Sequence, residues 1–417
     1  MRCGRLSTVL LAVLLLPAAG GRAQEWTRFR GPNGTGVSAA QSIPVTWTDA
    51  DYLWQTRLPG KGHGSPVVWG RKLFLLSADP DSATRYVICI DTDTGETLWQ
   101  RDYAAAPHAL NALNSYASST PAVDEQRVYV AWGTGDRLLL RALDHDGREV
   151  WMQDLGAYVC EHGFGNSPIV YEDLVILVNS QQAEELEPNQ QPGRSSVMAF
   201  DRETGQLRWE TPRTVARVCY STPCVYQPPE GPPELICHDK GHGFYSLDPR
   251  TGAENWSLPV FTLRTVASPI IVGDLVFGCA GSGGGGHYLV AARLGQQPQE
   301  VYRVTRQAPY ITTSIARGDL VFLCVDRGLV SCMQAADGTI VWSKRLSRGF
   351  AGSPVLVDGK LYVIDSDGEV LVLAAEREFK QLGRVALGEP SRATPAVAGG
   401  RMFLRTESQL FCIGGGR

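Results

Sequence analysis

The stretch that decides the fold is Ala199–Trp209, which reads Ala-Phe-Asp-Arg-Glu-Thr-Gly-Gln-Leu-Arg-Trp. The same order of aspartate, Thr-Gly and tryptophan recurs at Asp91–Trp99 and Asp248–Trp256. A copy one residue shorter ends at Trp151, and Gln334–Trp342 keeps the length without the first aspartate. Aspartate can accept a hydrogen bond from the backbone two residues on, and glycine allows a positive φ. Each copy therefore predicts a tight turn that leads into a strand carrying the tryptophan.

A second repeated marker is Ser-Pro or Thr-Pro followed by small or β-branched apolar residues. Its prolines are Pro66, Pro121, Pro168, Pro223, Pro269, Pro354 and Pro395, and a degenerate copy without proline lies at Ser314–Ala316. Pro66 and Pro395 are 329 residues apart, which corresponds to seven intervals of 47 residues. A fixed period of this length is typical of repeat architectures, and it predicts eight units.

Each unit continues with the pattern of an antiparallel hairpin. After the turn Asp358–Lys360, residues Leu361–Ile364 read as a strand, Asp365–Gly368 as a turn and Glu369–Leu373 as the returning strand. Runs of Val, Leu, Ile and Tyr bounded by Asp and Gly are typical of strands. The helical period of 3.6 is nowhere sustained, so we predict an all-β fold.

Six of the ten tryptophans occupy the repeated position, and we expect them to dock each unit on its neighbour. These are Trp54, Trp99, Trp151, Trp209, Trp256 and Trp342. A large apolar side chain at a repeated position is most often a packing residue. We interpret them as structural docking residues.

These motifs resemble the β-propellers with PQQ-like repeats, whose docking motif A-x-D-x-x-T-G-x-x-x-W is matched at Ala199–Trp209. The resemblance covers about residues 47–414. It is similar overall to BamB-type periplasmic proteins and to secreted PQQ-like repeat proteins, and Trp26–Pro32 looks like the start of the latter. The resemblance implies an eight-bladed propeller of four-stranded antiparallel blades.

The two ends of the repeat array complement each other. Trp54 has no Ser-Pro strand before it, and no tryptophan segment follows Ile413. We therefore expect Tyr52–Arg57 to supply the outer strand of the last blade, which removes an open sheet edge. The predicted domains are a signal peptide at 1–23, an N-terminal extension at 24–46 and the propeller at 47–417. We expect deletion of residues 24–40 to be tolerated.

The N-terminus has the pattern of a secretory signal. Arg2 and Arg5 precede an apolar stretch at Leu6–Leu16, and small residues at Gly21–Ala23 offer a cleavage point. A short membrane anchor is the alternative interpretation. Cys3 precedes the apolar stretch, where a lipid-modified cysteine would follow it. We expect an exported protein, periplasmic or extracellular, without a lipid anchor or a transmembrane span in the mature chain.

Nine cysteines follow the predicted signal, and most lie in apolar strand patterns where a thiol behaves as a small hydrophobe. No C-x-x-C motif occurs. We interpret the cysteines as core residues, but Cys160 and Cys219 fall in predicted loops and could pair.

Composition narrows the classes of partner. The chain is 43% hydrophobic and 20% charged with a net charge of −4, which excludes a disordered chain and gives nucleic acid no general attraction. We expect a monomer whose partner is a protein or a small anionic ligand.

Residues that bind such a partner are predicted in the loops before the inner strands, because these loops ring one mouth of a propeller's channel. The candidates are Lys61, His63, His162, Arg217, Tyr220, Arg264, Arg348 and Arg392. Converging basic side chains can focus a positive field despite the negative net charge. The alternative is that they are surface residues paired with acids of other loops.

Two local motifs have a simpler reading as turns. Gly281–His287 lacks the ending of a phosphate-binding loop, and His238–His242 aligns with the hairpin turns of other units. We assign no catalytic residue and no metal ligand.

We therefore expect a non-catalytic binding or scaffold protein of the cell envelope that needs no cofactor. The alternative is a PQQ-dependent quinoprotein oxidoreductase with calcium, which the resemblance suggests. Such enzymes carry adjacent cysteines, calcium ligands and a catalytic aspartate. The sequence has no Cys-Cys pair, and neither the ligands nor the aspartate can be matched to positions in it.

Overall fold

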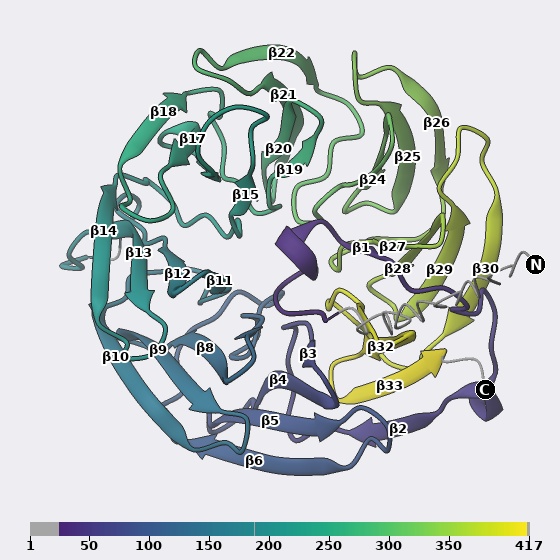
Figure 1. Ribbon diagram of the computed structural model, residues 1–417, viewed down its shortest axis with the longest axis horizontal. Coiled ribbons are helices and arrows are strands. Elements are labelled where there is room, and N and C mark those ends of the chain that lie inside the picture. Colours follow the sequence, from purple (N-terminus) through teal and green to yellow (C-terminus); the bar gives the residue numbers. More distant parts are fainter. Residues whose placement is uncertain (1–24, 187, 415–417) are drawn as a thin grey trace, which may run out of the picture.

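The computed structural model describes residues 25–186 and 188–414. Eight antiparallel sheets, called blades here, stand around a central axis, as Figure 1 shows. The only helices in the described residues are two 3₁₀ turns, η1 (Pro32–Gly34) and η2 (Asp49–Asp51). The prediction of an all-β, eight-bladed propeller is confirmed. The predicted signal peptide lies outside the described residues.

Within a blade the strands follow one another from the channel to the rim. Blade 1 contains β3 (Val67–Trp69), β4 (Lys72–Ala78), β5 (Arg85–Asp91) and β6 (Thr97–Tyr103). Blade 2 contains β7 (Ala122–Val123), β8 (Arg127–Gly133), β9 (Arg137–Asp144) and β10 (Glu149–Ala157). Blade 3 contains β11 (Ile169–Tyr171), β12 (Leu174–Asn179), β13 (Ser195–Asp201) and β14 (Leu207–Arg213). Blade 4 contains β15 (Cys224–Tyr226), β16 (Glu234–Asp239), β17 (Gly243–Leu247) and β18 (Glu254–Leu258).

The second half of the ring repeats this order. Blade 5 contains β19 (Ile270–Val272), β20 (Leu275–Ser282), β21 (Gly285–Arg293) and β22 (Gln299–Val304). Blade 6 contains β23 (Ile315–Arg317), β24 (Leu320–Cys324), β25 (Leu329–Gln334) and β26 (Ile340–Arg345). Blade 7 contains β27 (Val355–Val357), β28 (Lys360–Ile364), β29 (Glu369–Ala374) and β30 (Gln381–Ala386), with β1 (Val37–Ser38) added in parallel to β27. Blade 8 contains β31 (Ala396–Ala398), β32 (Arg401–Arg405), β33 (Gln409–Gly414) and β2 (Trp54–Arg57).

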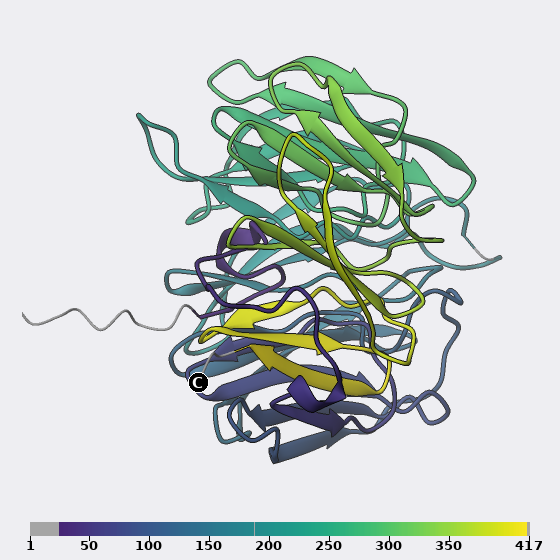
Figure 2. The ribbon, with the colours of Figure 1, turned by 90° about the vertical axis from the view of Figure 1, so that its right-hand side faces the viewer.

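The ring closes through its N-terminal strand, as predicted. Strand β2 pairs antiparallel with β33, with Trp54 opposite Cys412 and Arg57 opposite Gln409. Figures 1 and 2 show β2 lying beside the last strand of the chain. The closing strand gives the last sheet its fourth member, so blade 8 is as complete as the others.

The repeated aspartate, glycine and tryptophan act together at the blade interfaces. The Asp201 carboxylate accepts backbone N–H groups of Glu203 and Thr204, which shapes the turn. The indole N–H of Trp209 donates to the Pro249 carbonyl of the next blade at 3.2 Å. A Cβ on Gly252 would lie 2.4 Å from the Trp209 ring, so only glycine fits beneath it.

The same bond to a carbonyl of the next blade is made by five of the six tryptophans: Trp54, Trp99, Trp151, Trp209 and Trp342. Trp256 packs at the interface of blades 4 and 5, but its N–H donates to Glu234 of its own blade. In blade 5 the docking position is taken by Tyr302, whose hydroxyl donates to Ala335 of blade 6.

The N-terminal extension is part of the propeller's interior. Trp26 pairs with Val68 of blade 1 and is fully buried. The Arg28 guanidinium donates to Pro223 of blade 4, and Arg30 donates to Thr313 and Pro354 of blades 6 and 7. Figure 1 shows this purple segment in the middle of the ring. We call Glu25–Ser38 the plug; because it packs into the ring, its deletion is expected to lower stability, and the truncations described below test whether it is tolerated.

The remaining sequence interpretations concern loops and cysteines. Gly281–His287 and His238–His242 both lie in hairpins, at β20–β21 and β16–β17. The nine cysteines of the described chain are free thiols, including Cys160 and Cys219. All but Cys160 are buried, which confirms their role as core residues.

Candidate functional site

A ring of hydroxyl groups surrounds the central channel. The Ser or Thr before each inner strand accepts the backbone N–H of its counterpart in the preceding blade, at 2.9–3.0 Å, across seven of the eight blade junctions. We call these eight residues the hydroxyl ring: Ser65, Thr120, Ser167, Thr222, Ser268, Thr313, Ser353 and Thr394. Thr313 fills this place in blade 6, one residue before the degenerate copy that begins at Ser314. The ring explains why the repeated marker has a hydroxyl residue.

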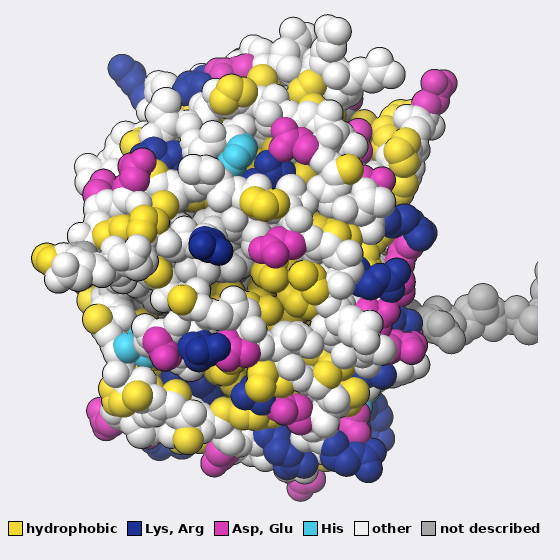
Figure 3. All heavy atoms as spheres, turned by 90° about the vertical axis from the view of Figure 1, so that its left-hand side faces the viewer, with side chains coloured by type: hydrophobic (Ala, Val, Ile, Leu, Met, Phe, Trp, Pro, Cys, Tyr) yellow, Lys and Arg dark blue, Asp and Glu magenta, His cyan; other side chains and the backbone are white. Residues whose placement is uncertain are grey.

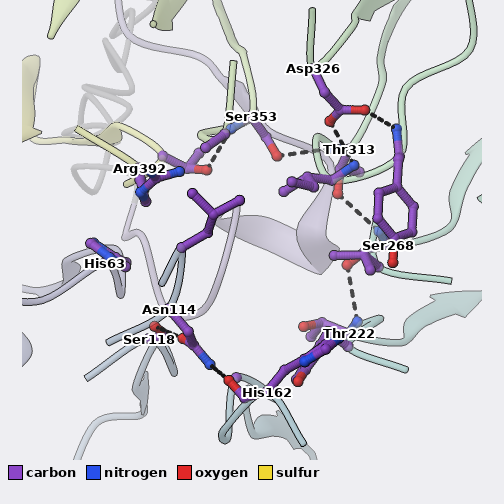
Figure 4. A pocket seen from close by; sticks show the side chains of 18 of the residues that line it. His63, Asn114, Ser118, His162, Thr222, Ser268, Thr313, Asp326, Ser353 and Arg392 are labelled. Carbon is purple, nitrogen blue, oxygen red and sulfur yellow. Dashed lines mark hydrogen bonds between the residues drawn. The ribbon is translucent and has the colours of Figure 1, made fainter. Parts of the chain in front are cut away.

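The hydroxyl ring forms the wall of a cavity of about 450 Å³. Phe29 of the plug also lines this cavity, so the plug occupies the channel on one side of it. Figure 4 shows side chains of different blades, among them His63, Thr222, Asp326 and Arg392, facing the cavity. The volume lies in the range of small-molecule sites. We call it the central cavity.

Three arginines line the central cavity: Arg264, Arg392 and the exposed Arg327. Arg264 is 8% exposed, and its Nε donates to the Val218 carbonyl at 2.9 Å. Its guanidinium lies over the ring of Tyr220, 5.6 Å from the centroid. Arg392 also lines the cavity and is partly exposed. Within the described chain, none of the three arginines has a carboxylate oxygen within 4.0 Å, so their charges are available to a ligand.

Asp326 is the single carboxylate among the residues that line the cavity. Its oxygens accept the backbone N–H groups of Tyr310 and Ile311 at 2.8 and 2.9 Å, as Figure 4 shows. His287 Nδ1 lies 3.4 Å from Asp326 Oδ2. Burial raises the pKa of Asp326 above its usual range. The carboxylate is therefore already engaged by protein groups.

Two histidines of the cavity, His63 and His162, have lowered pKa values that favour the neutral form. Burial, together with the nearby charges of Arg392 and Arg405, lowers the pKa of His63 to about 3. The pKa of His162 is lowered by burial and by Arg264. Both shifts have the sign expected for imidazoles in a positive, poorly hydrated site.

The structure brings five of the eight predicted mouth residues to the cavity: His63, His162, Tyr220, Arg264 and Arg392. The other three do not line it. Lys61 forms an ion pair with Glu407 at 2.9 Å, and Arg217 forms one with Glu161 at 2.8 Å. Arg348 is exposed at the surface. For Lys61 and Arg217 the alternative interpretation, pairing with acids of other loops, therefore describes the structure.

Sequence reasoning did not single out Asp326, His287 or the hydroxyl ring as site residues. His287 belongs to the Gly281–His287 motif, which is interpreted above as a turn, and Asp326 lies in the hairpin between β24 and β25; Figure 4 shows Asp326 at the cavity. The ring was visible as the repeated Ser-Pro and Thr-Pro marker, because a repeated polar residue at an inner strand of a closed ring must face its counterparts. No group of three His, Cys, Asp or Glu side chains in the described residues is arranged to hold a metal ion.

The outer surface differs from the cavity. On the side seen in Figure 3, Lys and Arg side chains lie among Asp and Glu side chains over most of the face, and several of them lie together at its lower edge. In the described chain no helix has the length and hydrophobicity needed to cross a membrane.

Comparison with known sequences places these features in a family. The sequence profile described as "Outer membrane protein assembly factor BamB" matches residues 83–325 and 311–378. The protein of that name from Moranella endobia (strain PCIT) is 24% identical over 298 residues, which cover 68% of this chain and 71% of the relative. The protein of the same name from Yersinia pestis is 22% identical over 281 residues; the match covers 63% of this chain and 64% of that relative, less than two thirds of its length.

Solved structures show the same fold. BamB from Moraxella catarrhalis superimposes with a TM-score of 0.63 at 14% identity, over 87% of this chain and 99% of that one. Quinohemoprotein alcohol dehydrogenase from Comamonas testosteroni superimposes with a TM-score of 0.70 at 13% identity, over 96% and 82% of the two chains. At these identities the likeness concerns the fold alone. Because the profile matches more than half of the chain, the protein belongs to the PQQ-like repeat β-propellers of the BamB family.

Proposed function

We propose that the protein is an exported, non-catalytic binding or scaffold propeller that mediates interactions in the cell envelope. The observation that carries this proposal is the central cavity, which is lined from all eight blades and offers hydroxyl, guanidinium and aromatic groups to a ligand. A ring that positions many loops around one cavity is suited to recognition, since rigid strands hold the variable loops in place.

The family supports a role in the envelope. The relatives from Moranella endobia and Yersinia pestis are named as outer membrane protein assembly factors. The secretory pattern at residues 1–23 is consistent with export. These observations favour a protein partner in the envelope.

The second candidate is a PQQ-dependent oxidoreductase, which the fold of quinohemoprotein alcohol dehydrogenase suggests. The residues of the central cavity do not fit the calcium ion that such a centre uses. Calcium takes six to eight oxygen ligands, with carboxylates prominent among them. Asp326 is the single carboxylate at the cavity and already accepts two backbone N–H groups. The donor set thus favours the binding role.

The test is photo-crosslinking in the envelope of the native host. A photoreactive amino acid at Leu113, which lines the cavity and is 55% exposed, should capture a protein partner. The same residue at Val301, exposed on the outer strand β22, is the matched control. Absence of a product specific to Leu113 would contradict the scaffold role.

The oxidoreductase is tested in parallel with the purified protein. After incubation with PQQ and calcium, we expect no dye-linked oxidation of primary alcohols. Alcohol oxidation that depends on added PQQ would support the oxidoreductase and contradict the non-catalytic binding role.

A further inference from the structure

The hydroxyl ring makes the central cavity rich in hydrogen-bond donors. Seven of its hydroxyl oxygens accept a backbone N–H, and none of the eight hydroxyls donates to another described residue. All eight residues are more than nine-tenths buried. A hydroxyl has a single hydrogen to donate. That hydrogen is therefore left for a group inside the cavity, and such a group must be an acceptor.

The charges of the cavity point to the same kind of ligand. Arg264 is more than nine-tenths buried, with its Nε bonded to a backbone carbonyl and no carboxylate of the described chain within 4.0 Å. A buried guanidinium without an anion is costly, and a bound anion offsets that cost. Arg392 and the exposed Arg327 add further positive charge at the cavity wall. Because the carboxylate of Asp326 is already hydrogen-bonded to protein groups, the charge that the cavity offers to a ligand is positive.

Part of the lining is apolar. Phe29 from the plug, Leu113 and Ile311 contribute hydrophobic surface to the same cavity. An inorganic anion would leave this apolar surface in contact with water. A ligand that combines an anionic oxygen group with an apolar body would use both parts of the lining.

We propose that the central cavity binds an organic anion, whose carboxylate is held by Arg264 and hydroxyls of the ring, in a positive field to which Arg392 adds, and whose apolar body lies against Phe29, Leu113 and Ile311. This inference rests on the binding role proposed above and names its ligand chemistry. The carboxylate can belong to a small organic acid or to the C-terminal residue of a polypeptide. The cavity would recognise the carboxylate of either source in the same way, and the experiment below distinguishes the two sources.

The test is calorimetric titration of the full-length mature protein with two probes. The first is phthalate, with phthalamide as its neutral counterpart. The second is the peptide acetyl-Ala-Leu-Phe with a free C-terminus, with its C-terminal amide as the neutral counterpart. We expect at least one acid to bind and its amide not to bind. Phthalate binding indicates a small acid as the source, and peptide binding indicates a chain end.

The variant Arg264→Gln should weaken binding about ten- to a hundredfold, the loss expected for a hydrogen bond to a charged group. Arg348→Gln is the matched control, because it removes the same charge from an exposed arginine outside the cavity, and it should bind like the parent. If Arg264→Gln does not fold, Arg392→Gln makes the same test at a more exposed position of the lining.

Three results would overturn the proposal: no binding of either acid by the parent, equal binding of acids and amides, or equal weakening in Arg264→Gln and Arg348→Gln. These results are separable from a failure of the scaffold role. The scaffold role fails if photo-crosslinking from Leu113 captures no partner, whatever the titrations show, and the cavity can fail to bind acids while Leu113 still captures a protein.

Discussion

The hydroxyl oxygen of Ser65 accepts the backbone N–H of Thr394 at 3.0 Å, although 329 residues separate the two in sequence. The bond joins blade 1 to blade 8 and completes one side of the hydroxyl ring. Together with the pairing of β2 and β33, it fastens the two ends of the chain at the inner and the outer side of the propeller. Closure of the ring therefore depends on two contacts, the Ser65–Thr394 hydrogen bond beside the channel and the β2–β33 pairing at the rim.

Replacing Ser65 by alanine should lower the free energy of unfolding by about 1–3 kcal/mol, because the buried N–H of Thr394 loses its acceptor. Ser65→Thr keeps the hydroxyl and should cost much less, since threonine occupies the same place in blades 2, 4, 6 and 8. Urea titrations followed by tryptophan fluorescence measure both variants. Equal losses for alanine and threonine would show that the hydroxyl does not matter.

Trp209→Ala should lower the free energy of unfolding by roughly 3–5 kcal/mol, the usual cost of emptying a large buried aromatic site. The change removes the bond to Pro249 and leaves a void above Gly252. Leu207→Ala, on the same strand but 49% exposed, is the control and should stay within about 0.5 kcal/mol. A melting temperature of Trp209→Ala equal to that of the control would refute the docking role.

Truncation separates the plug from the closing strand. A chain that begins at Ala39 lacks the plug but keeps β2, so it should remain monomeric and unfold at a lower temperature than a chain that begins at Glu25. A chain that begins at Pro59 also lacks β2, which exposes the edge of β33, and it should aggregate.

Size-exclusion chromatography and scanning calorimetry of the three chains check this order. A monomeric Pro59 chain with the stability of the Ala39 chain would rule out closure by β2. Equal stability of the Glu25 and Ala39 chains would show that the plug only occupies space.

Much of the fold could be predicted because its determinants are local and repeated. The Asp-Thr-Gly turn and the tryptophan lie within nine residues at Asp91–Trp99, and the regular spacing of the Ser-Pro and Thr-Pro marker implied the number of blades. Closure of the ring by Tyr52–Arg57 could also be predicted, because the last repeat lacks a tryptophan strand and the N-terminal segment contains one without the rest of its repeat. Trp256 is the exception. Its indole N–H forms no hydrogen bond to blade 5, because blade 5 lacks the Asp-Thr-Gly turn.

The plug could not be predicted, because its contacts are neither local nor periodic. Arg30 reaches Thr313 and Pro354, which lie 283 and 324 positions away. Nothing in the residues around Arg30 marks these carbonyls as its partners. From the sequence alone, an arginine on a segment before the first repeat is expected to be exposed, and only the topology shows that it is buried.

The candidate site was predictable only in part for a related reason. A ring fold brings equivalent loops together, which placed Arg264 and Arg392 at one cavity. The individual partner of each charge depends on distant loops, as with Lys61 and Glu407, which are 346 positions apart. Charge counting along the sequence could not separate the paired cations from the unpaired ones.

His238 should make the protein sensitive to acid. The side chain is 2% exposed between Phe244 and Phe261, and neither ring nitrogen makes a hydrogen bond to a described residue. Burial lowers the pKa of His238 to about 4, whereas the pKa of an unfolded histidine is about 6.5. Between these values the unfolded chain binds a proton that the folded chain does not, so the free energy of unfolding falls as the pH falls.

The shift corresponds to about 3 kcal/mol of stability, fully present above pH 6.5 and lost progressively as the pH falls to 4. His238→Leu has no proton to bind, and it should therefore lose about that much less stability than the parent between pH 7 and pH 4. Other titrating groups are common to both proteins and cancel in the difference. Urea titrations at pH 7, 5.5 and 4 measure it. Parallel loss of stability in the two proteins would mean that His238 is protonated as easily in the folded chain as in the unfolded one.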